Sequence, residues 1–476
     1  MENRMNTNVA SWKRVHMVGI KGVAMTALAL YLSEHRVKVA GSDVADVFPT
    51  DSELHKAKIP MMVGFDMTRF DSTYKPDCVI YTGAHSGREN PEVLAAIERG
   101  IPTYPHGQAL GMVMENSRQI AVGGSHGKTT TSAMIATIMM TVKTDPSYAI
   151  GCGSIGGLGR AGHSGQGSWF ISEADEYVTD PGHDQTPRFL WMNPEILVVT
   201  NIDFDHPDAY PNLASVQEAF VKLQAKQVGQ KLTIVNIDDE ASKPLLGGEN
   251  IITYGFSPRA DMQITHVGDG DERTFFTLSL NGTAVGEFVL KVPGVHNVAN
   301  ATAAIIAAHA AGLSWADIKT GLLAFTGTKR RFEKLGEVAG ALFYDDYAHH
   351  PHEIEATLAA ARRWYPRRRI VAIFQPHTYS RTKALLPEFA RAFAGADMTI
   401  LTDIYASARE SDTLGISGKT LVDEVSNRQK AVYYGKDVAG VVAILEKEIH
   451  VDDVVIFMGA GDVYTWEKDV LEKLKV

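Results

Sequence analysis

Short apolar runs that alternate with helical segments dominate the beginning of the chain. Val15–Gly19, Val37–Gly41 and Cys78–Tyr81 are apolar runs bounded by glycine or polar residues, which is typical of buried strands. Val23–Glu34 and Pro91–Arg99 carry apolar residues at helical spacing. Strands that alternate with helices pair in parallel through right-handed crossovers, so this pattern predicts an open α/β unit.

The middle of the chain shows the same alternation and then changes its period. Gln119–Val122, Trp169–Ser172 and Ile196–Thr200 are predicted to be parallel strands. Between Asp261 and Leu290, polar and apolar residues alternate, with Asn281-Gly282 as a strong signal for a two-residue hairpin turn. We therefore expect a small antiparallel sheet inserted in, or appended to, a parallel one.

The last part of the chain is predicted to be another α/β unit. Its expected strands are Arg369–Phe374, Met398–Thr402, Ala431–Tyr434 and Val454–Met458, and Lys383–Ala394 is one of the expected helices. A chain of 476 residues is too long for one hydrophobic core. We predict three α/β domains, of which the first and last are Rossmann-like, with bounds at 1–116, 117–326 and 327–476.

The composition of the chain limits which binding partners and which cellular environment we expect. The net charge of −10 offers no basic surface to a nucleic-acid backbone. Two cysteines, Cys78 and Cys152, fit isolated buried thiols in a reducing compartment better than a disulfide scaffold. No apolar run is long enough to span a bilayer, and Met1–Trp12 is polar and is expected to be a disordered lead-in. We expect a soluble cytoplasmic protein that binds neither nucleic acid nor membrane.

The most informative motif follows the strand Gln119–Val122 and opens a helical segment. It consists of Gly124, Ser125, His126, Gly127, Lys128, Thr129 and Thr130. In such a loop, backbone N–H groups and the helix N-terminus face a phosphate, the lysine reaches the β/γ oxygens, and the threonine hydroxyl holds Mg²⁺. Val122 stands where the usual spacing has a glycine, so this is a shortened form of the motif. The central domain is therefore predicted to be P-loop ATPase-like and to bind ATP.

A second glycine turn follows the first strand. Gly19 and Gly22 form the pattern G-x-x-G-x-A, and Ser42-Asp43 follows the second strand. Glycines let a diphosphate approach a helix N-terminus, and an acidic residue after the second strand suits a ribose or sugar hydroxyl. A tight turn without a ligand and a dinucleotide coenzyme are the alternatives.

Two strand ends supply candidate metal ligands. Glu173 and Asp175 follow the strand Trp169–Ser172, and His206 lies in the acid-rich segment after Ile196–Thr200. Because the carboxyl ends of parallel strands meet at one edge, we expect Glu173 to join Thr129 at a Mg²⁺ ion. His206 would touch metal or substrate. The alternative is a solvated acidic loop.

Further polar clusters lie near and within the predicted third domain. Asn297 opens an Ala-rich helical segment and would read an adenine edge or simply cap the helix. Arg331 suits a phosphate contact that forms on domain closure, or a solvated basic turn. Asp346 and His349 end a strand, and Arg381 suits bidentate binding of a carboxylate or phosphate.

These sites together describe an enzyme that uses ATP, a second phosphorylated substrate and a third reactant. A ligase that activates a carboxylate fits three domains better than a kinase. The sequence has neither a G-x-S-x-G nucleophile elbow nor paired C-x-x-C zinc motifs. An NAD-type oxidoreductase built on the first domain is the alternative of another class, but it leaves Lys128 and Thr129 without a role.

The motifs, taken in order, resemble the Mur ligases of peptidoglycan synthesis. The matching stretches are G-S-H-G-K-T-T at 124–130, E-A-D-E at 173–176, N-I-D-F-D-H-P-D at 201–208, H-N-x-x-N at 296–300, R-R-F-E at 330–333 and D-D-Y-A-H-H-P at 345–351. Three more are similar to the members that join L-alanine to UDP-N-acetylmuramate: G-I-K-G-V-A-M at 19–25, F-Q-P-H-T-Y-S-R-T-K at 374–383 and L-T-D-I-Y-A-S-A-R-E at 401–410.

The resemblance implies a reaction in which ATP, UDP-N-acetylmuramate and L-alanine give ADP, phosphate and UDP-N-acetylmuramoyl-L-alanine through an acyl phosphate. It implies that Lys128 stabilises the γ-phosphoryl charge, and that Thr129 and Glu173 hold Mg²⁺. His206 would lie by a second Mg²⁺ or the muramate carboxylate. The protein would be a monomer or a homodimer.

The resemblance also assigns roles to residues outside the phosphate loop. Asn297 would contact adenine, Asp346 the ATP ribose, and Arg331 the γ-phosphate after closure. His349 and Arg381 would face the reacting acyl group and the amino acid. The UDP-sugar would be held by Gly19, Gly22, Ser42 and Asp43.

Some positions depart from the family pattern. Lys21 and Ala24 replace glycines common in the first turn, and Thr378 lies where many members have arginine. The segment from Glu176 to Pro194 is longer than usual and is reminiscent of the related ligase that recycles murein tripeptide onto the same nucleotide sugar. That ligase, and a non-catalytic UDP-sugar sensor, are further alternatives.

Overall fold

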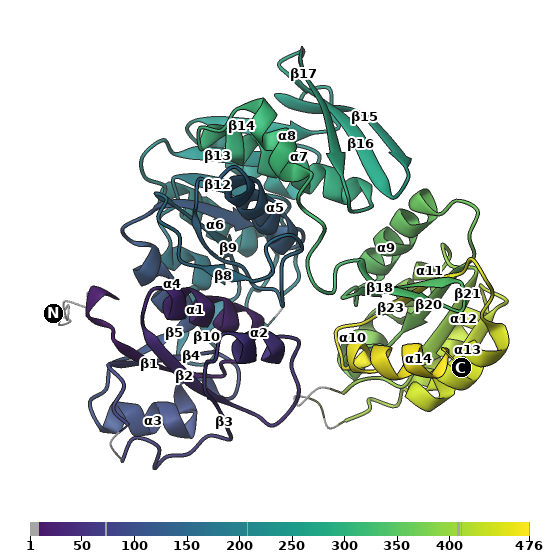
Figure 1. Ribbon diagram of the computed structural model, residues 1–476, viewed down its shortest axis with the longest axis horizontal. Coiled ribbons are helices and arrows are strands. Elements are labelled where there is room, and N and C mark those ends of the chain that lie inside the picture. The colour runs from purple at the N-terminus through teal and green to yellow at the C-terminus, as the bar shows by residue number, and fades with distance from the viewer. Residues whose placement is uncertain (1–8, 72–73, 207, 407–409, 411, 476) are drawn as a thin grey trace. The chain divides into compact units, whose positions relative to one another are not determined.

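The computed structural model describes residues 9–71, 74–206, 208–406, 410 and 412–475 (Figure 1). It contains three large sheets whose strands alternate with helices, which confirms the α/β class and the predicted series of three sheets. The residues form two compact units. The first holds the chain up to Val267 together with Phe276–Leu290 and Asn297–Thr328, and the second holds the remainder. The domain bounds near residues 116 and 326 stay predictions.

The first sheet has five parallel strands in the order β3-β2-β1-β4-β5. The strands are β1 (Arg14–Val18), β2 (Lys38–Asp43), β3 (Met61–Val63), β4 (Cys78–Tyr81) and β5 (Thr103–Pro105). The helices are η1 (Val9–Ser11), α1 (Val23–Glu34), α2 (Asp51–Lys56), η2 (Gly87–Glu89), α3 (Pro91–Glu98) and α4 (His106–Met114). The strand order reverses between β1 and β4, so the loops after these two strands diverge and leave a crevice at the carboxyl edge.

The N-terminal prediction needs one correction. Residues 1–8 of the expected disordered lead-in lie outside the described residues. Trp12, in contrast, is buried and stacks on Tyr104 with ring centroids 5.8 Å apart. The segment is polar on average, but the indole ring of Trp12 has a large apolar surface that is stabilised by burial. Trp12 therefore packs into the first domain.

The central sheet has ten strands in the order β17-β16-β15-β14-β13-β12-β6-β9-β7-β8. The strands are β6 (Arg118–Gly123), β7 (Ser147–Ala149), β8 (Gly162–His163), β9 (Trp169–Ala174), β12 (Ile196–Val199), β13 (Leu232–Asn236), β14 (Ile251–Gly255), β15 (Met262–Gly270), β16 (Arg273–Leu280) and β17 (Thr283–Leu290). The strand β6 pairs in parallel with β12 on one side and with β9 on the other. The loops that follow these three strands therefore meet at one edge.

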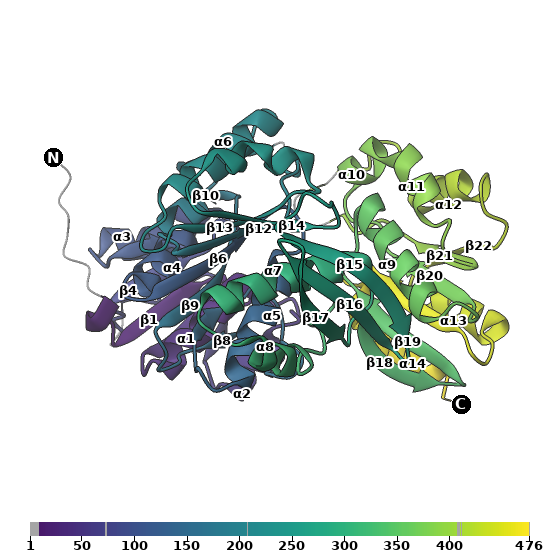
Figure 2. The ribbon, with the colours of Figure 1, turned by 90° about the horizontal axis from the view of Figure 1, so that it is seen from above.

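Helices cover both faces of the central sheet. Figure 2 shows α5 (Lys128–Thr141), α7 (Val295–Ala310) and α8 (Trp315–Leu322) on one face and α6 (Leu213–Ala225) on the other. The short helix η4 (Glu240–Gly247) follows β13. The predicted antiparallel hairpin is β16 and β17, joined by Asn281-Gly282, and it prolongs the edge of the parallel sheet. It is thus appended to the sheet.

A small separate hairpin lies between β9 and β12. Its strands β10 (Val178–Asp180) and β11 (Asp184–Pro187) are antiparallel, and the short helix η3 (Arg188–Trp191) follows directly. The backbone of η3 packs against α4 of the first sheet, where a Cβ on Gly111 would lie 2.3 Å from the Trp191 carbonyl oxygen. The long segment noted in the sequence therefore joins the first two sheets.

The third sheet has six strands in the order β18-β19-β23-β20-β21-β22. The strands are β18 (Glu333–Val338), β19 (Ala341–Asp346), β20 (Ile370–Phe374), β21 (Met398–Thr402), β22 (Val432–Lys436) and β23 (Val454–Met458). Two buried apolar clusters lie on its two faces, one with α9 (Pro351–Trp364), α11 (Leu386–Ala392) and α12 (Gly418–Ser426), the other with α13 (Val438–Glu448) and α14 (Glu467–Lys473). The short helix η5 (Val463–Thr465) precedes α14.

The predicted helix Lys383–Ala394 is wrong in its bounds. The chain forms α10 (Tyr379–Ala384) and then α11, separated at Leu385, whose φ is −110°. Pro387 has no N–H to donate and restricts the residue before it, so a continuous helix through this point is disfavoured. The first short helix begins instead directly after Thr378, whose positive φ of 67° makes a sharp turn after β20.

Candidate active site

The phosphate loop connects β6 to α5 and depends on two glycines in conformations that other residues avoid. Gly124 has a φ of 132° and Gly127 a φ of 85°. A Cβ on Gly124 would lie 2.1 Å from Thr200 Oγ1, and one on Gly127 would lie 2.4 Å from Asn300 Oδ1. The loop therefore passes in close contact with the end of β12 and with α7.

Asn201 fixes the middle of the loop. Its Oδ1 accepts the His126 N–H at 2.9 Å, and its Nδ2 donates to the His126 carbonyl at 2.9 Å. Its own carbonyl accepts the Ser125 N–H at 3.2 Å. These hydrogen bonds fix the backbone of the loop just before Lys128, Thr129 and Thr130, which form the first turn of α5. The N–H groups of a helix's first turn have no intrahelical acceptor and so suit a phosphate.

Lys128 lies inside the loop and is paired with a carboxylate. Its Nζ donates to the Gly124 carbonyl at 2.5 Å and to Glu176 Oε2 at 2.9 Å. The Glu176 side chain is only 2% exposed. Burial of the amine opposes its charge, but the negative charges of Glu176 and Asp175 outweigh burial and raise the pKa of Lys128. The Lys128 amine is therefore protonated, and its position is fixed by these hydrogen bonds.

Thr129, in the first turn of α5, contacts Glu173 near the end of β9. Thr129 Oγ1 donates to Glu173 Oε2 at 2.8 Å, and the Gly151 N–H donates to Glu173 Oε1 at 2.6 Å. Burial raises the pKa of the Glu173 carboxyl group. A hydroxyl and a carboxylate in contact beside a phosphate loop form an all-oxygen donor pair, which fits Mg²⁺ because this ion keeps several waters and phosphate oxygens.

His206 lies beside the same carboxylate that pairs with Lys128. Its Nε2 is 3.8 Å from Glu176 Oε1, and its ring packs on Tyr177 with centroids 5.0 Å apart. Among the described residues, no group of three or more His, Cys, Asp or Glu side chains is arranged to hold a metal ion. Contact of His206 with a second Mg²⁺ stays a prediction.

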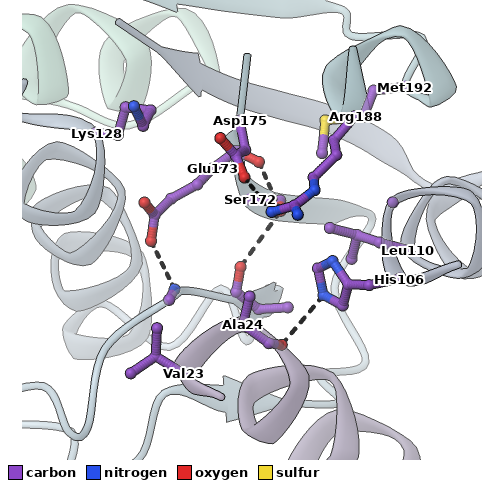
Figure 3. A pocket seen from close by; sticks show the side chains of 13 residues that line it. Val23, Ala24, His106, Leu110, Lys128, Ser172, Glu173, Asp175, Arg188 and Met192 are labelled. Carbon is purple, nitrogen blue, oxygen red and sulfur yellow. Dashed lines mark hydrogen bonds and ion pairs between the residues drawn. The ribbon is translucent and has the colours of Figure 1, made fainter. Parts of the chain in front are cut away.

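A cavity of about 270 Å³ opens next to Lys128 and Glu173. Figure 3 shows Lys128 and Glu173 on one side and Arg188 and His106 on the other. Val23 and Ala24, at the start of α1, line the same cavity. The first residues of the two helices that follow the phosphate loop and the glycine turn therefore border one shared space.

The first glycine turn lies at the crevice between β1 and β4. Gly19 has a φ of 79°, and a Cβ on it would lie 2.3 Å from Thr82 Cγ2 in the loop after β4. The N–H groups of Gly19 and Ile20 donate to the Ser42 carbonyl at 2.8 and 3.3 Å. Gly22 precedes the first residue of α1, so the turn directs a helix N-terminus into the crevice.

Ser42 and Asp43 are both fully buried, and they differ in what their side chains do. The Ser42 hydroxyl donates to the buried Glu92 inside the domain, which does not favour contact with a UDP-sugar. That contact stays a prediction. Asp43 Oδ2 accepts the Lys21 N–H at 2.8 Å, and Oδ1 lies 3.4 Å from His85 Nε2. Asp43 thus holds the turn next to the crevice.

Asp346, His349 and Arg381 end or follow the strands β19 and β20, whereas Arg331 precedes β18, which pairs antiparallel with β19. Asp346 accepts the Phe332 N–H at 2.8 Å and the Ala348 N–H at 2.9 Å, and burial raises its pKa against the opposing charge of Arg331. Burial lowers the pKa of His349, and the charges of Arg381 and Arg331 act on it in the same direction. Arg331 therefore acts electrostatically on both Asp346 and His349, and Arg381 acts on His349.

The alternative role of Asn297 as a plain helix cap is wrong. The helix α7 already begins at Val295, so Asn297 lies in its first turn. Its Oδ1 accepts a hydrogen bond from Asn300 Nδ2 at 3.3 Å. Residues three apart share one helix face, which brings Asn297 next to the asparagine that touches Gly127. Contact of Asn297 with adenine stays a prediction.

Several residues that build this site had no role predicted from the sequence. Glu176 pairs with Lys128, Asn201 fixes His126, and Asn300 touches Gly127. Arg188 and His106 line the cavity. The motifs E-A-D-E and H-N-x-x-N already contained Glu176 and Asn300, whereas nothing in the sequence pattern marked Arg188 or His106. Both cysteines are free and buried, as expected. Pro207 and residues 407–409 of the quoted motifs lie outside the described residues.

The central sheet has a phosphate loop at its switch point, and the helix after this loop shares a cavity with the first helix of the preceding sheet. Together with a third α/β sheet, this is the architecture of an ATP-dependent ligase. The chain belongs to the Mur ligase family. Residues 14–118 match the Mur ligase family catalytic domain, residues 122–308 the Mur ligase middle domain, and residues 330–461 the Mur ligase glutamate ligase domain.

Relatives are similar over almost the whole chain. A UDP-N-acetylmuramate–L-alanine ligase of Desulfitobacterium hafniense is 39% identical, over 94% of this chain and 97% of its own length. One of Caldanaerobacter subterraneus is 38% identical, over 99% of this chain and 100% of its own length. The crystal structure of the UDP-N-acetylmuramate-alanine ligase from Thermotoga maritima superimposes with a TM-score of 0.81 at 29% identity, covering 97% of this chain and 98% of that one.

A murein peptide ligase from Psychrobacter arcticus shares the fold. It superimposes with a TM-score of 0.70 at 24% identity and covers 97% of this chain and 99% of that one. Among the described residues, none of the helices combines the length and the apolar character needed to cross a bilayer.

Proposed function

We propose that this chain joins L-alanine to UDP-N-acetylmuramate while cleaving ATP to ADP and phosphate. One observation carries the proposal: the Lys128–Glu176 and Thr129–Glu173 contacts lie beside a cavity that the glycine-turn helix of the first sheet also lines. The two full-length relatives named for this reaction support it over a dinucleotide-dependent oxidoreductase, a non-catalytic sensor and a murein tripeptide ligase.

The reaction proceeds in two steps. A carboxylate oxygen of the muramate attacks the γ-phosphorus of ATP, the bond to the β-γ bridging oxygen breaks, and ADP leaves. The resulting acyl phosphate is attacked at its carbonyl carbon by the amino group of L-alanine. The tetrahedral intermediate loses a proton and expels phosphate, which leaves the amide.

The residues of the phosphate loop stabilise charge in the first step. Lys128 is held as a cation by Glu176 and would meet the negative charge that develops on the γ-phosphoryl group. The first-turn N–H groups of α5 would donate to the same anion. Because phosphoryl transfer involves little covalent chemistry by the protein, positioning and charge neutralisation account for most of the acceleration.

Mg²⁺ is part of the proposal. Thr129 and Glu173 would hold the ion, which would neutralise phosphate charge, and His206 would contact a second ion or the muramate carboxylate. Asn297 would contact adenine. The nucleotide sugar would be held by Gly19, Gly22 and Asp43, whose turn lies at the crevice of the first sheet.

The third sheet would supply the groups for the second step. Arg331 would contact the γ-phosphate and Asp346 the ribose, while His349 and Arg381 would face the acyl group and L-alanine. Burial and nearby cations lower the pKa of His349, so at neutral pH its imidazole is neutral and can accept a proton from the attacking amine. We place the reaction in the cytoplasm, where ATP is available, and expect a monomer or a homodimer with domain bounds near 116 and 326.

The test measures phosphate release and product mass with UDP-N-acetylmuramate, Mg-ATP and either L-alanine or murein tripeptide. We expect stoichiometric ADP, phosphate and UDP-N-acetylmuramoyl-L-alanine with L-alanine, and no product when ATP is omitted. Turnover with the tripeptide and none with L-alanine would replace the proposal by the recycling ligase. Tight binding of the nucleotide sugar without phosphate release in either mixture would favour a sensor.

A further inference from the structure

Arg188 is a cation in the cavity that the proposed reaction leaves without a role. It begins η3, after the β10–β11 hairpin, and its side chain lines the cavity from the side opposite Lys128 and Glu173 (Figure 3). Only 21% of the side chain is exposed. The position is specific to the long segment between β9 and β12, because η3 follows the hairpin that this segment forms.

The guanidinium group is held from several sides. Its Nη1 donates to Asp175 Oδ2 at 2.7 Å, and its Nε donates to the Val178 carbonyl at 3.1 Å. The Tyr177 ring lies 5.3 Å from the centre of the group. Within the part of the chain that the structure describes, Nη2 donates to no acceptor. The orientation of the planar guanidinium group is therefore fixed, and its Nη2 can donate to another group.

Two glycines make room for this side chain. A Cβ on Gly107, in the first turn of α4, would lie 3.1 Å from the Arg188 Cβ. A Cβ on Gly83 would lie 3.5 Å from Arg188 Nη2 and 2.9 Å from Pro181 in the hairpin. The backbone of the first domain thus approaches Arg188 closely on two sides. The Arg188 side chain therefore lies against this backbone and also lines the cavity.

The remaining groups on this side of the cavity are neutral or apolar. Burial, together with the charge of Arg188, lowers the pKa of His106 to about 4, so its imidazole is uncharged at neutral pH. His106 Nε2 faces the Ala24 carbonyl at 3.2 Å and must donate to it, which leaves Nδ1 as an acceptor. Val23, Leu110 and Met192 supply apolar walls. The site suits a molecule with an apolar face, a hydroxyl or amide donor and an anionic group.

The geometry points to Arg188 as the residue that recognises the acid group of the nucleotide sugar, with Asp175 as the positioning residue that orients its guanidinium group. This inference rests on the proposed function. A carboxylate bound by Arg188 lies in the same cavity as Lys128, so the arginine holds the nucleophile near the phosphate loop before the γ-phosphoryl group is transferred.

A purely structural role is the competing explanation. The Arg188–Asp175 pair could serve only to attach the hairpin to the central sheet. Buried ion pairs contribute little net stability when both partners are present, but removing one partner leaves an unpaired charge. Arg118 offers a matched control, because it forms a two-point pair with Glu195 at 2.8 and 2.7 Å in the same unit and does not line the cavity.

The test compares the affinity of the full-length protein for UDP-N-acetylmuramate and for UDP-N-acetylglucosamine, which lacks the lactyl carboxylate. We expect R188A to weaken UDP-N-acetylmuramate on the order of 10- to 100-fold, the range for a charge-assisted hydrogen bond, and UDP-N-acetylglucosamine less than about threefold. R188K should recover part of the loss, since it keeps the charge without the fork. D175N should raise KM for UDP-N-acetylmuramate more than KM for ATP, because Glu176 still pairs with Lys128.

Equal losses for the two nucleotide sugars, or no loss for either, would overturn the inference. A loss in R118A as large as that in R188A would also overturn it and assign both arginines to stability. ATP affinity within about twofold of the native value shows that R188A is folded. If the native protein releases no phosphate, the proposed function fails, while the ratio of the two affinities still decides the role of Arg188.

Discussion

The Nζ of Lys128 lies 2.9 Å from Glu176 Oε2, and the carboxylate side chain is 2% exposed. A carboxylate from the loop after β9 therefore neutralises the lysine of a loop that follows β6. The two strands are parallel neighbours, so their carboxyl ends present both groups at one edge. The pair keeps the lysine charged and holds its amine inside the loop.

Replacement of Glu176 by glutamine should destabilise the ligand-free protein. The substitution leaves a buried cation without its counter-charge, and we expect a loss of about 1–3 kcal/mol in the free energy of unfolding. Mg-ATP should restore much of this loss, because phosphate oxygens supply the missing negative charge. Thermal unfolding with and without Mg-ATP measures both effects. An ATP-induced stabilisation no larger than that of the native protein would contradict this account of the pair.

Replacement of Lys128 by alanine should abolish ATP-dependent turnover and leave nucleotide-sugar binding largely intact. The lysine neutralises charge that develops on the γ-phosphoryl group, whereas the sugar is expected to contact the first glycine turn. Phosphate release measures the loss of turnover, and equilibrium binding of UDP-N-acetylmuramate measures whether nucleotide-sugar binding is retained. K222A, on the exposed face of α6, is the control and should retain full activity. Unchanged phosphate release in K128A would refute the role of the loop.

Replacement of Glu173 by glutamine should raise the Mg²⁺ concentration needed for half-maximal activity. Removing one carboxylate ligand of a hard cation weakens its binding, and we expect a shift on the order of tenfold, since metal-site variants commonly lose 10- to 100-fold in affinity. The amide oxygen can still accept the hydrogen bond from the Gly151 N–H, and the amide NH2 can donate to the Thr129 hydroxyl, so the local structure should persist. An unaltered Mg²⁺ titration would remove Glu173 from the metal site.

The third sheet contains a pair of carboxyl groups that makes its stability depend on pH. Burial and the adjacent charge of Asp345 raise the pKa of Glu467 from its ordinary 4.5. Asp345 Oδ1 and Glu467 Oε1 are both buried without a hydrogen-bond partner among the described residues. One of them must therefore hold a proton in the folded state. Asp345 also pairs with Arg330 at 3.0 Å.

The direction of the pH effect follows from this raised pKa. Between 4.5 and the folded-state pKa, the folded protein binds more protons than the unfolded chain, so stability falls as pH rises. E467Q removes this titration, and its melting temperature should decrease less than that of the native protein between pH 6 and about 8.5. E472Q, on the exposed side of α14, is the control and should behave like the native protein. Parallel pH profiles for E467Q and the native protein would rule out the shared proton.

The sequence was most informative where local rules and tertiary structure agree. The strand ends at Gly19, at the phosphate loop and at Glu173 all followed from apolar runs and glycine punctuation. The bounds of α1 and of the hairpin turn at Asn281-Gly282 were also close, since both depend on interactions within a few residues. The break between α10 and α11 was missed because it depends on the sharp turn at Thr378 and on Pro387 together.

The sequence by itself determined that parallel strands end in a phosphate loop, a glycine turn and clusters of acids, because each of these depends on residue types at fixed short spacings. Only the tertiary structure decided which side chains share a space. Glu176 meets Lys128 from 48 residues away, and Arg188 reaches the cavity only because Gly83 and Gly107 of the first domain make room for it. Such contacts depend on how separate elements pack together, and the spacing of residues along the chain does not predict that packing.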